Sequence, residues 1–121
     1  MGVLLMEINE DNLAPTVINL NANKNGELNE SWLQMFGNAV KGILSYSLDS
    51  GSSLRIPPEY RIRGTSSQIN SFARALKGEE KYLKAASEFG LDDPKTFRSK
   101  SKLDVAIRNF ERKTGIKWPF K

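Results

Sequence analysis

Cationic side chains, interleaved with aromatic ones, crowd the last quarter of the chain. The cations are Lys95, Arg98, Lys100, Lys102, Arg108, Arg112, Lys113 and Lys117. Phe97 and Trp118 lie among them. Binding of nucleic acid requires cations spaced to meet phosphates and, for single strands, aromatic faces on which bases can stack. The segment therefore predicts a phosphate-driven association with DNA or RNA, with little sequence specificity.

Carboxylates in and beside the same segment leave a second interpretation open. They are Glu88, Asp92, Asp93, Asp104 and Glu111. Exposed ion pairs between these groups and the neighbouring cations would contribute little to stability and would give a solvated helix of mixed charge. The residues are compatible with both a nucleic-acid surface and a solvated charged face.

The residue types present do not indicate catalysis. The chain has no histidine and no cysteine, which removes the usual general base near neutral pH, the thiolate nucleophile and the commonest zinc ligands. The Asp92–Asp93 pair with Glu111 and Lys113 resembles the acid–acid–lysine set of metal-dependent nucleases. Positions i and i+2 of a helix point apart, however, so Glu111 and Lys113 would not share a site. We therefore predict a non-catalytic binding protein without cofactor or metal.

Charge is divided between the two parts of what we expect to be one domain, residues 1–121. Residues 1–53 carry two lysines against six carboxylates, a net charge of −4. Residues 54–121 have a net charge of +8, so the whole chain has +4. A basic part attached to an acidic one indicates a surface for a polyanion, or two parts that face each other.

The acidic part contains a long apolar helix, predicted over residues 28–48 with Asn29 as its N-cap. Large apolar side chains recur along it at helical spacing, among them Trp32, Phe36, Val40 and Ile43. Apolar stripes of this kind are mostly buried within their own domain. The alternative is that this helix forms the interface with a protein partner or a second copy of the chain.

Short strands are expected before this helix and after it. Ile18 and Leu20 alternate with asparagines, which is the period-two pattern of a half-buried strand. In residues 54–63 apolar residues alternate with arginines, which predicts one or two short strands with a basic face. We include Arg61 and Arg63 among the predicted phosphate contacts.

The basic part is predicted to be helical, which makes the whole a mainly α bundle of about four helices. Thr65 and Gln68 have the spacing of a capping box, so a helix should start here. It continues over 65–77 and 79–89 as two helices, or as one bent at Gly78. Asp93 before a proline is a second start signal, and a third at Ser101 opens a helix over 101–114. These helices could form a helix-turn-helix-like unit whose last helix faces DNA.

The sequence ends in two aromatic residues beside a proline. A segment with Trp118 and Phe120 around Pro119 cannot be helical, yet each ring has about 150–250 Å² to bury. We predict that it folds back onto Leu103, Ile107 and Phe110. A protruding recognition peptide is the alternative.

Three runs resemble small uncharacterised proteins encoded by tailed bacteriophages. They are Arg61-Ile62-Arg63-Gly64-Thr65, Gly90-Leu91-Asp92-Asp93-Pro94 and Thr114-Gly115-Ile116-Lys117-Trp118-Pro119-Phe120. The resemblance implies an origin in a phage or prophage rather than an activity. It supports a second hypothesis, a phage structural or host-interaction protein that assembles through helix 28–48, Trp118 and Phe120.

No stretch approaches the roughly 20 apolar residues that a membrane-spanning helix requires. The first residues also lack the positive n-region of a signal peptide. We therefore expect no membrane partner and a cytoplasmic location, which would be the host cytoplasm for a phage protein.

Overall fold

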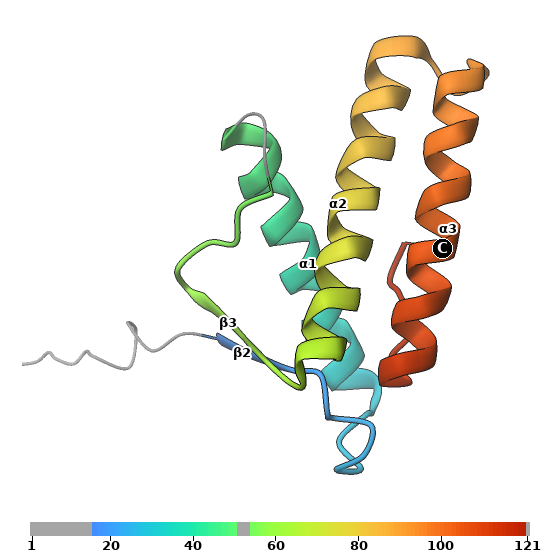
Figure 1. Cartoon of the computed structure of the whole chain (residues 1–121). Helices are drawn as coiled ribbons and strands as arrows, with labels where there is room; N and C mark the ends of the chain where they lie inside the picture. The colour runs from blue at the N-terminus through green and yellow to red at the C-terminus, as the bar shows by residue number, and fades with distance from the viewer. Residues whose placement is uncertain (1–15, 51–53, 121) are drawn as a thin grey trace, which may run out of the picture.

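The computed structural model describes residues 16–50 and 54–120, which form three helices and two short strands (Figure 1). Along the chain these are β2 (Thr16–Asn19), α1 (Glu30–Ser50), β3 (Tyr60–Arg63), α2 (Ser66–Phe89) and α3 (Pro94–Thr114). The mainly α fold with a minor β element is therefore confirmed. Within the described residues there are three helices rather than about four.

Gly78 does not interrupt α2, which runs continuously through it. A Cβ atom at Gly78 would lie 3.3 Å from Cδ1 and 3.4 Å from Cα of Leu103 in α3. Because Gly78 has no side chain, the two helices can approach closely there. The packing that results compensates for the low helix propensity of glycine. The prediction of two separate helices is therefore wrong, and α2 is one helix.

The second start signal is the one that begins α3. Asp93 caps the helix by accepting a 2.8 Å hydrogen bond from the backbone N–H of Lys95, and Pro94 occupies the first turn. The helix then passes through Ser101 without a break. Because α2 and α3 form one antiparallel pair of long helices (Figure 1), the predicted helix-turn-helix-like unit is wrong as well.

The two strands pair in parallel, with Ile18 opposite Ile62. They are joined through α1, as the crossover of a parallel pair requires. Ile18 is fully buried, whereas Arg61 and Arg63 are exposed. Residues 54–56, which were a further expected strand segment, form no strand.

One hydrophobic core joins all three helices and the C-terminal segment. At its centre are four aromatic rings, those of Phe36, Phe72, Phe110 and Trp118. The Phe36 and Phe110 centroids are 6.0 Å apart with nearly parallel planes, and Trp118 meets Phe110 edge-on at 5.4 Å. Offset and edge-to-face pairs of this kind stabilise a core beyond the area that they bury.

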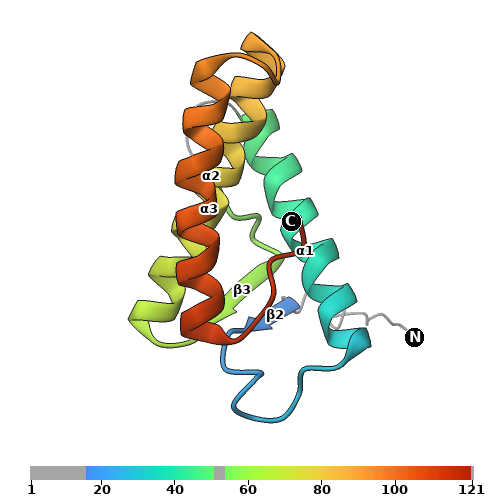
Figure 2. The same cartoon turned by 90° about the vertical axis from the view of Figure 1, so that its right-hand side faces the viewer.

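The chain turns back after α3 and runs between α3 and α1 (Figure 2). Trp118 is 3 % exposed, and its indole Nε1 donates a 2.9 Å hydrogen bond to the Glu79 carboxylate of α2. Its backbone N–H donates to Glu111 at 2.8 Å. The predicted docking of this segment on the core is confirmed.

The apolar helix also lies inside the core. Asn29 caps it by accepting a hydrogen bond from the Trp32 N–H. Phe36, Val40 and Ile43 are fully buried within this chain, so they are not available as the partner interface that was the alternative interpretation. Trp32 stacks on Phe36 and, like Phe120, is partly buried.

Candidate nucleic-acid interface

The solvent-facing side of α2 carries a stripe of cations. Arg74, Lys77, Lys81 and Lys84 recur at intervals of three and four residues, which places them on one face of a helix. This face is opposite the buried Phe72 and Leu76. Ser67 and Asn70 extend the stripe towards the start of α2, and Glu88 follows Lys84 near its end.

A second stripe lies on the adjacent side of α3. It comprises Lys95, Lys102, Asn109 and Lys113. Where the two helices meet, a groove of about 360 Å³ brings the stripes together. Its lining residues are Ser67, Asn70, Ser71 and Arg74 of α2 with Asn109 and Lys113 of α3. We call the seven cations of the two stripes the α2–α3 basic face: Arg74, Lys77, Lys81, Lys84, Lys95, Lys102 and Lys113.

Two carboxylates of α2, Glu79 and Glu80, are turned away from this face. Glu79 and Glu80 are each 4 % exposed, and Glu80 accepts a hydrogen bond from the Ser47 hydroxyl of α1. Burial raises the pKa of Glu79, while the Trp118 hydrogen bond and the nearby Lys100 oppose that rise. Within the two stripes Glu88 is the one carboxylate, so the outer surface keeps its positive charge.

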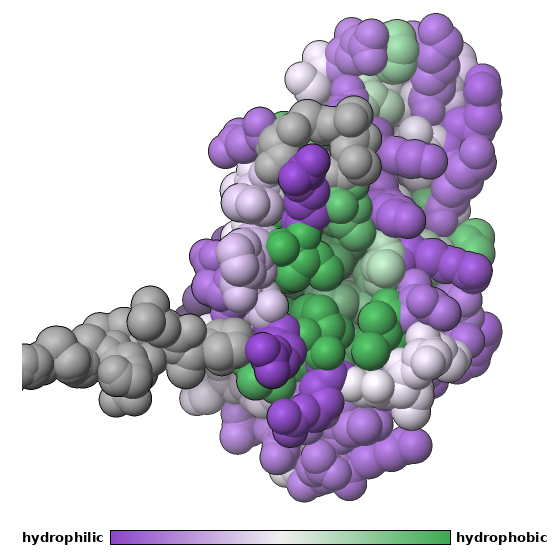
Figure 3. All heavy atoms as spheres, turned by 60° about the vertical axis from the view of Figure 1, so that its left-hand side comes forward, coloured by the Kyte–Doolittle hydropathy of each residue, from purple (hydrophilic) through white to green (hydrophobic). Residues whose placement is uncertain are grey.

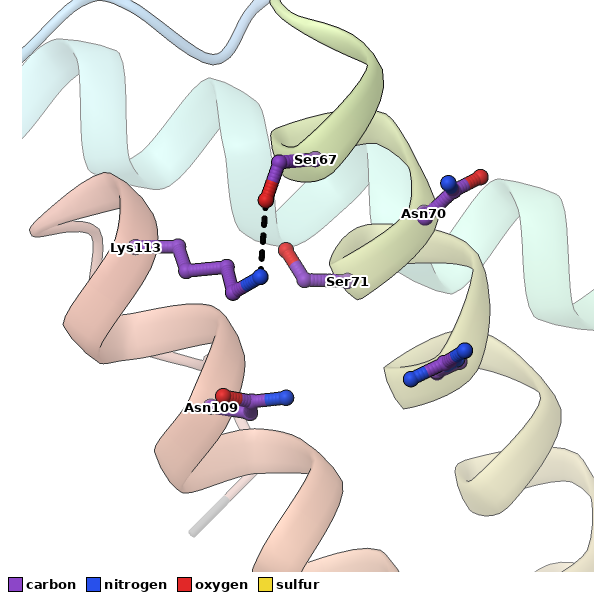
Figure 4. A pocket seen from close by; sticks show the side chains of 6 residues that line it. Ser67, Asn70, Ser71, Asn109 and Lys113 are labelled. Atoms are coloured by element: carbon purple, nitrogen blue, oxygen red, sulfur yellow. Dashed lines mark hydrogen bonds between the residues drawn. The ribbon is translucent and has the colours of Figure 1, made fainter.

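The groove between the helices presents hydrogen-bond donors (Figure 4). The Lys113 ammonium donates a 2.7 Å hydrogen bond to the Ser67 hydroxyl oxygen, which leaves that hydroxyl's own proton free to donate. Arg112 donates a 2.6 Å hydrogen bond to Oδ1 of Asn109. The amide NH₂ of Asn109 consequently points towards α2, as Figure 4 shows.

Local hydrogen bonds fix the first turn of α2, and with it one wall of the groove. The predicted capping box is present: the Gln68 N–H donates to the Thr65 hydroxyl oxygen at 3.1 Å, and the Thr65 N–H donates to the Gln68 side chain at 2.8 Å. The Gln68 amide also donates to Asn21. On the other wall, Gly115 ends α3 in a left-handed conformation with φ of 73°.

The structure separates the cations that the sequence grouped together. Lys95, Lys102 and Lys113 lie on the α2–α3 basic face. Lys100 instead pairs with Asp104 at 3.1 Å. Figure 1 shows β3, which carries the two predicted arginines 61 and 63, on the opposite side of α2 from α3.

The remaining predicted cations have different surroundings. Arg112 holds the Asn109 amide, and Lys117 is exposed in the segment after α3. Arg98 is a helical neighbour of Lys95 and Lys102, whereas Arg108 projects from another side of α3. The predicted set therefore forms no single surface.

Sequence reasoning missed the cations of α2. Their spacing is visible in the sequence, since Arg74, Lys77, Lys81 and Lys84 follow one helical face. That helix was interpreted from its apolar stripe alone. Ser67 and Asn109 carry no signal of their own, because their role depends on the neighbouring helix.

An apolar area occupies the side of the molecule that carries the strands (Figure 3). Near the strands, Ile62 of β3 and Ile69 of α2 are partly buried against the core. Val17 of β2 is 37 % exposed and Ile56, just before β3, is 39 % exposed. Hydrophilic side chains border the area in Figure 3, so the apolar and basic surfaces are distinct.

Comparisons with known protein families, with curated proteins and with solved structures find no match. Among residues 16–50 and 54–120, no helix is long and apolar enough to cross a membrane. Within the same ranges, no three carboxylates gather into a group that could hold a metal ion. The fold and the surfaces alone therefore define the class: a mainly α protein with an α2–α3 basic face.

Proposed function

We propose that this protein binds nucleic acid through the α2–α3 basic face, by contacts to backbone phosphates and without catalysis. The observation that carries the proposal is the segregation of charge on α2 and α3. Seven cations lie on two adjacent outer stripes, while Glu79, Glu80 and Glu111 hydrogen-bond inwards or to the C-terminal segment. Release of counterions from phosphates would supply the affinity, and little sequence specificity is expected.

The dimensions of α2 suit this role. At 1.5 Å per residue, the stripe from Ser67 to Lys84 is about 26 Å long. Phosphates along one strand of B-DNA advance about 3.4 Å each along the helix axis, so the stripe matches about seven or eight of them. The four cations of α2 stand about 4.5–6 Å apart along the helix, which lets several of them reach phosphates at once.

A pair of matched variants tests the proposal. The first replaces Arg74, Lys81 and Lys102 of the α2–α3 basic face with alanine. The control replaces Lys41, Arg61 and Arg63, which lie on α1 and β3, and so removes the same charge. Circular dichroism verifies that both variants are folded.

Fluorescence anisotropy with a labelled duplex is measured over a range of salt concentrations. We expect the first variant to lower the slope of log K against log salt by about 2.7, as the loss of three phosphate contacts requires. The control should keep the slope of the unmodified protein. The reverse result would place the site at β3 and contradict the proposal.

The apolar area beside the strands favours a second candidate function, binding of a protein partner, as the phage structural or host-interaction hypothesis requires. Val17 and Ile56 would contribute apolar contacts there. The two functions differ in their response to salt, because phosphate contacts weaken steeply as salt rises whereas an apolar interface hardly responds. Replacement of Val17 and Ile56 with serine should abolish association only in the second case.

A further inference from the structure

The groove between α2 and α3 differs from the rest of the α2–α3 basic face in the direction of its polar atoms. Elsewhere on the face, Lys77, Lys81 and Lys102 are exposed, and the Lys95 ammonium lies 4.4 Å from the centre of the Phe89 ring. In the groove, Lys113 and Asn109 are already held by hydrogen bonds to Ser67 and Arg112. Preorganised donors lose less conformational entropy on binding, so this place should hold a ligand more specifically than its surroundings.

Donors outnumber acceptors among the groove's side chains. The Lys113 ammonium has two N–H groups left after its bond to Ser67, and the Asn109 NH₂ has two more. The acceptor oxygen of Asn109 already accepts a hydrogen bond from Arg112. Ser71 is buried, and its hydroxyl donates to the Gln68 carbonyl at 2.8 Å. The free hydrogen-bonding capacity therefore suits an acceptor-rich ligand.

The charge of the lining points to the same kind of ligand. Arg74 and Lys113 give the groove two positive charges, and no carboxylate lines it. Arg74 has no hydrogen-bond or ion-pair partner within the described ranges. A cation without an internal partner, beside aimed donors, is suited to a tetrahedral oxyanion.

We propose that the groove is a discrete site for one phosphate group, held by Lys113, Asn109 and Ser67, with Arg74 supplying the second charge. The inference deepens the proposed function and rests on it, because the phosphate is taken to belong to the nucleic acid. A volume of about 360 Å³ is larger than a phosphate needs and leaves room for the attached sugar. This one phosphate would fix the position of the strand on the α2–α3 basic face, since phosphate contacts determine register.

The test is a titration of the full chain with inorganic phosphate, followed by ¹H–¹⁵N NMR. Sodium chloride keeps the ionic strength constant. We expect saturable shifts at the Ser67 amide and at the side-chain NH₂ of Asn109. Shifts that rise linearly, and equally with chloride, would overturn the discrete site.

A matched pair of substitutions separates two effects on phosphate binding, that of the oriented hydrogen-bond donors and that of net charge. Asn109→Asp replaces the donors with acceptors and should weaken phosphate binding by about tenfold or more, equivalent to about 1.4 kcal/mol. Asn70→Asp makes the same change of charge on α2, but its side chain points away from Lys113 in Figure 4. It should cost no more than about threefold, because a charge at this distance is partly screened. Equal effects of the two variants would overturn the site.

Duplex binding distinguishes failure of this inference from failure of the proposed function. If Asn109→Asp and the unmodified protein bind duplex equally and no phosphate site is found, the inference fails and the basic face stands. If inorganic phosphate saturates the groove but duplex is not bound, the proposed function fails. Where the groove binds inorganic phosphate and the protein also binds duplex, oligonucleotides with and without a 5′-phosphate are compared. A preference for the 5′-phosphorylated form assigns the site to a terminal phosphate, and no preference assigns it to an internal one. Either result supports the site.

Discussion

Replacing Trp118 with alanine should remove most of the stability of this protein. The indole ring is 3 % exposed and contacts Phe36, Phe72 and Phe110 edge-on, with centroids 6.4, 6.1 and 5.4 Å away. Its Nε1 also supplies a hydrogen bond to the buried Glu79 carboxylate. The substitution therefore removes a core side chain and a hydrogen-bond donor together.

The magnitude follows from these two losses. Truncation of a buried aromatic residue to alanine costs about 3–5 kcal/mol. A buried acceptor left without its donor costs about 1–3 kcal/mol more. The sum of about 4–8 kcal/mol is comparable to the whole free energy of unfolding of a small domain, about 5–15 kcal/mol. At about 3–5 °C per kcal/mol for a chain of this size, Tm should fall by at least about 12 °C.

Urea unfolding followed by circular dichroism measures the loss of unfolding free energy. The variant Trp118→Phe separates the contribution of ring packing from that of the hydrogen bond to Glu79. The phenylalanine keeps most of the ring packing and removes the donor to Glu79, so we expect a cost of about 1–3 kcal/mol. In a Trp32→Phe background, Trp118 reports alone by fluorescence. A loss below about 1 kcal/mol for Trp118→Ala, or emission like that of free indole in water, would refute the docked position.

Three further predictions concern stability. Burial raises the pKa of Glu79 above its usual 4.5. At a pH between the two values, the native state therefore retains a proton that the unfolded chain releases. The stability that this group contributes is complete below pH 4.5 and is lost as the pH rises through the raised pKa. Glu79→Gln should flatten that fall, as urea titrations at several pH values would show, and an unchanged slope would contradict the assignment. Thr65→Ala should cost about 1 kcal/mol through loss of the capping box, with Ser66→Ala as the control that leaves the urea midpoint nearly unchanged. Gly115→Ala should cost about 1–2 kcal/mol of unfolding free energy in the same assay. The reasons are that φ is 73° and that the added methyl would lie 2.5 Å from Nδ2 of Asn23. If adding Asn23→Ala leaves this cost unchanged, the backbone conformation alone is responsible.

The elements that were predicted correctly are those whose signals are local. Thr65 and Gln68 form a capping box with each other, and Asp93 before a proline defines a helix start without help from the rest of the chain. The burial of Trp118 follows from its size and from the proline beside it. In each case the signal is readable within a few residues of sequence, although the side chains that cover Trp118 come from α1 and α2 as well.

The errors arose where a residue has two physical meanings. A glycine inside a helical pattern marks a break or a close contact with another helix, and only the position of Leu103 shows that Gly78 is the second kind. Ser101 has the chemistry of an N-cap, but the helix that begins at Pro94 has already satisfied the preceding backbone groups by hydrogen bonds within the helix. The partner element decides such cases, and it lies far away in the sequence.

The candidate site could be predicted from the sequence only in part, because the grouping of its cations depends on how the helices pack. Residue types alone predicted a basic surface, but the seven predicted cations on α3 point in several directions, and the sequence does not show which side of α3 packs against α2. Trp118 donates hydrogen bonds to Glu79 and Glu111, but it does not decide where these carboxylates lie. Glu79 is on the opposite side of α2 from Arg74, Lys77 and Lys81, so its position in the helix already keeps its charge away from the α2–α3 basic face. Which cations share that face therefore depends on how α2 and α3 pack, because the packing selects the side of α3 that lies beside the stripe on α2.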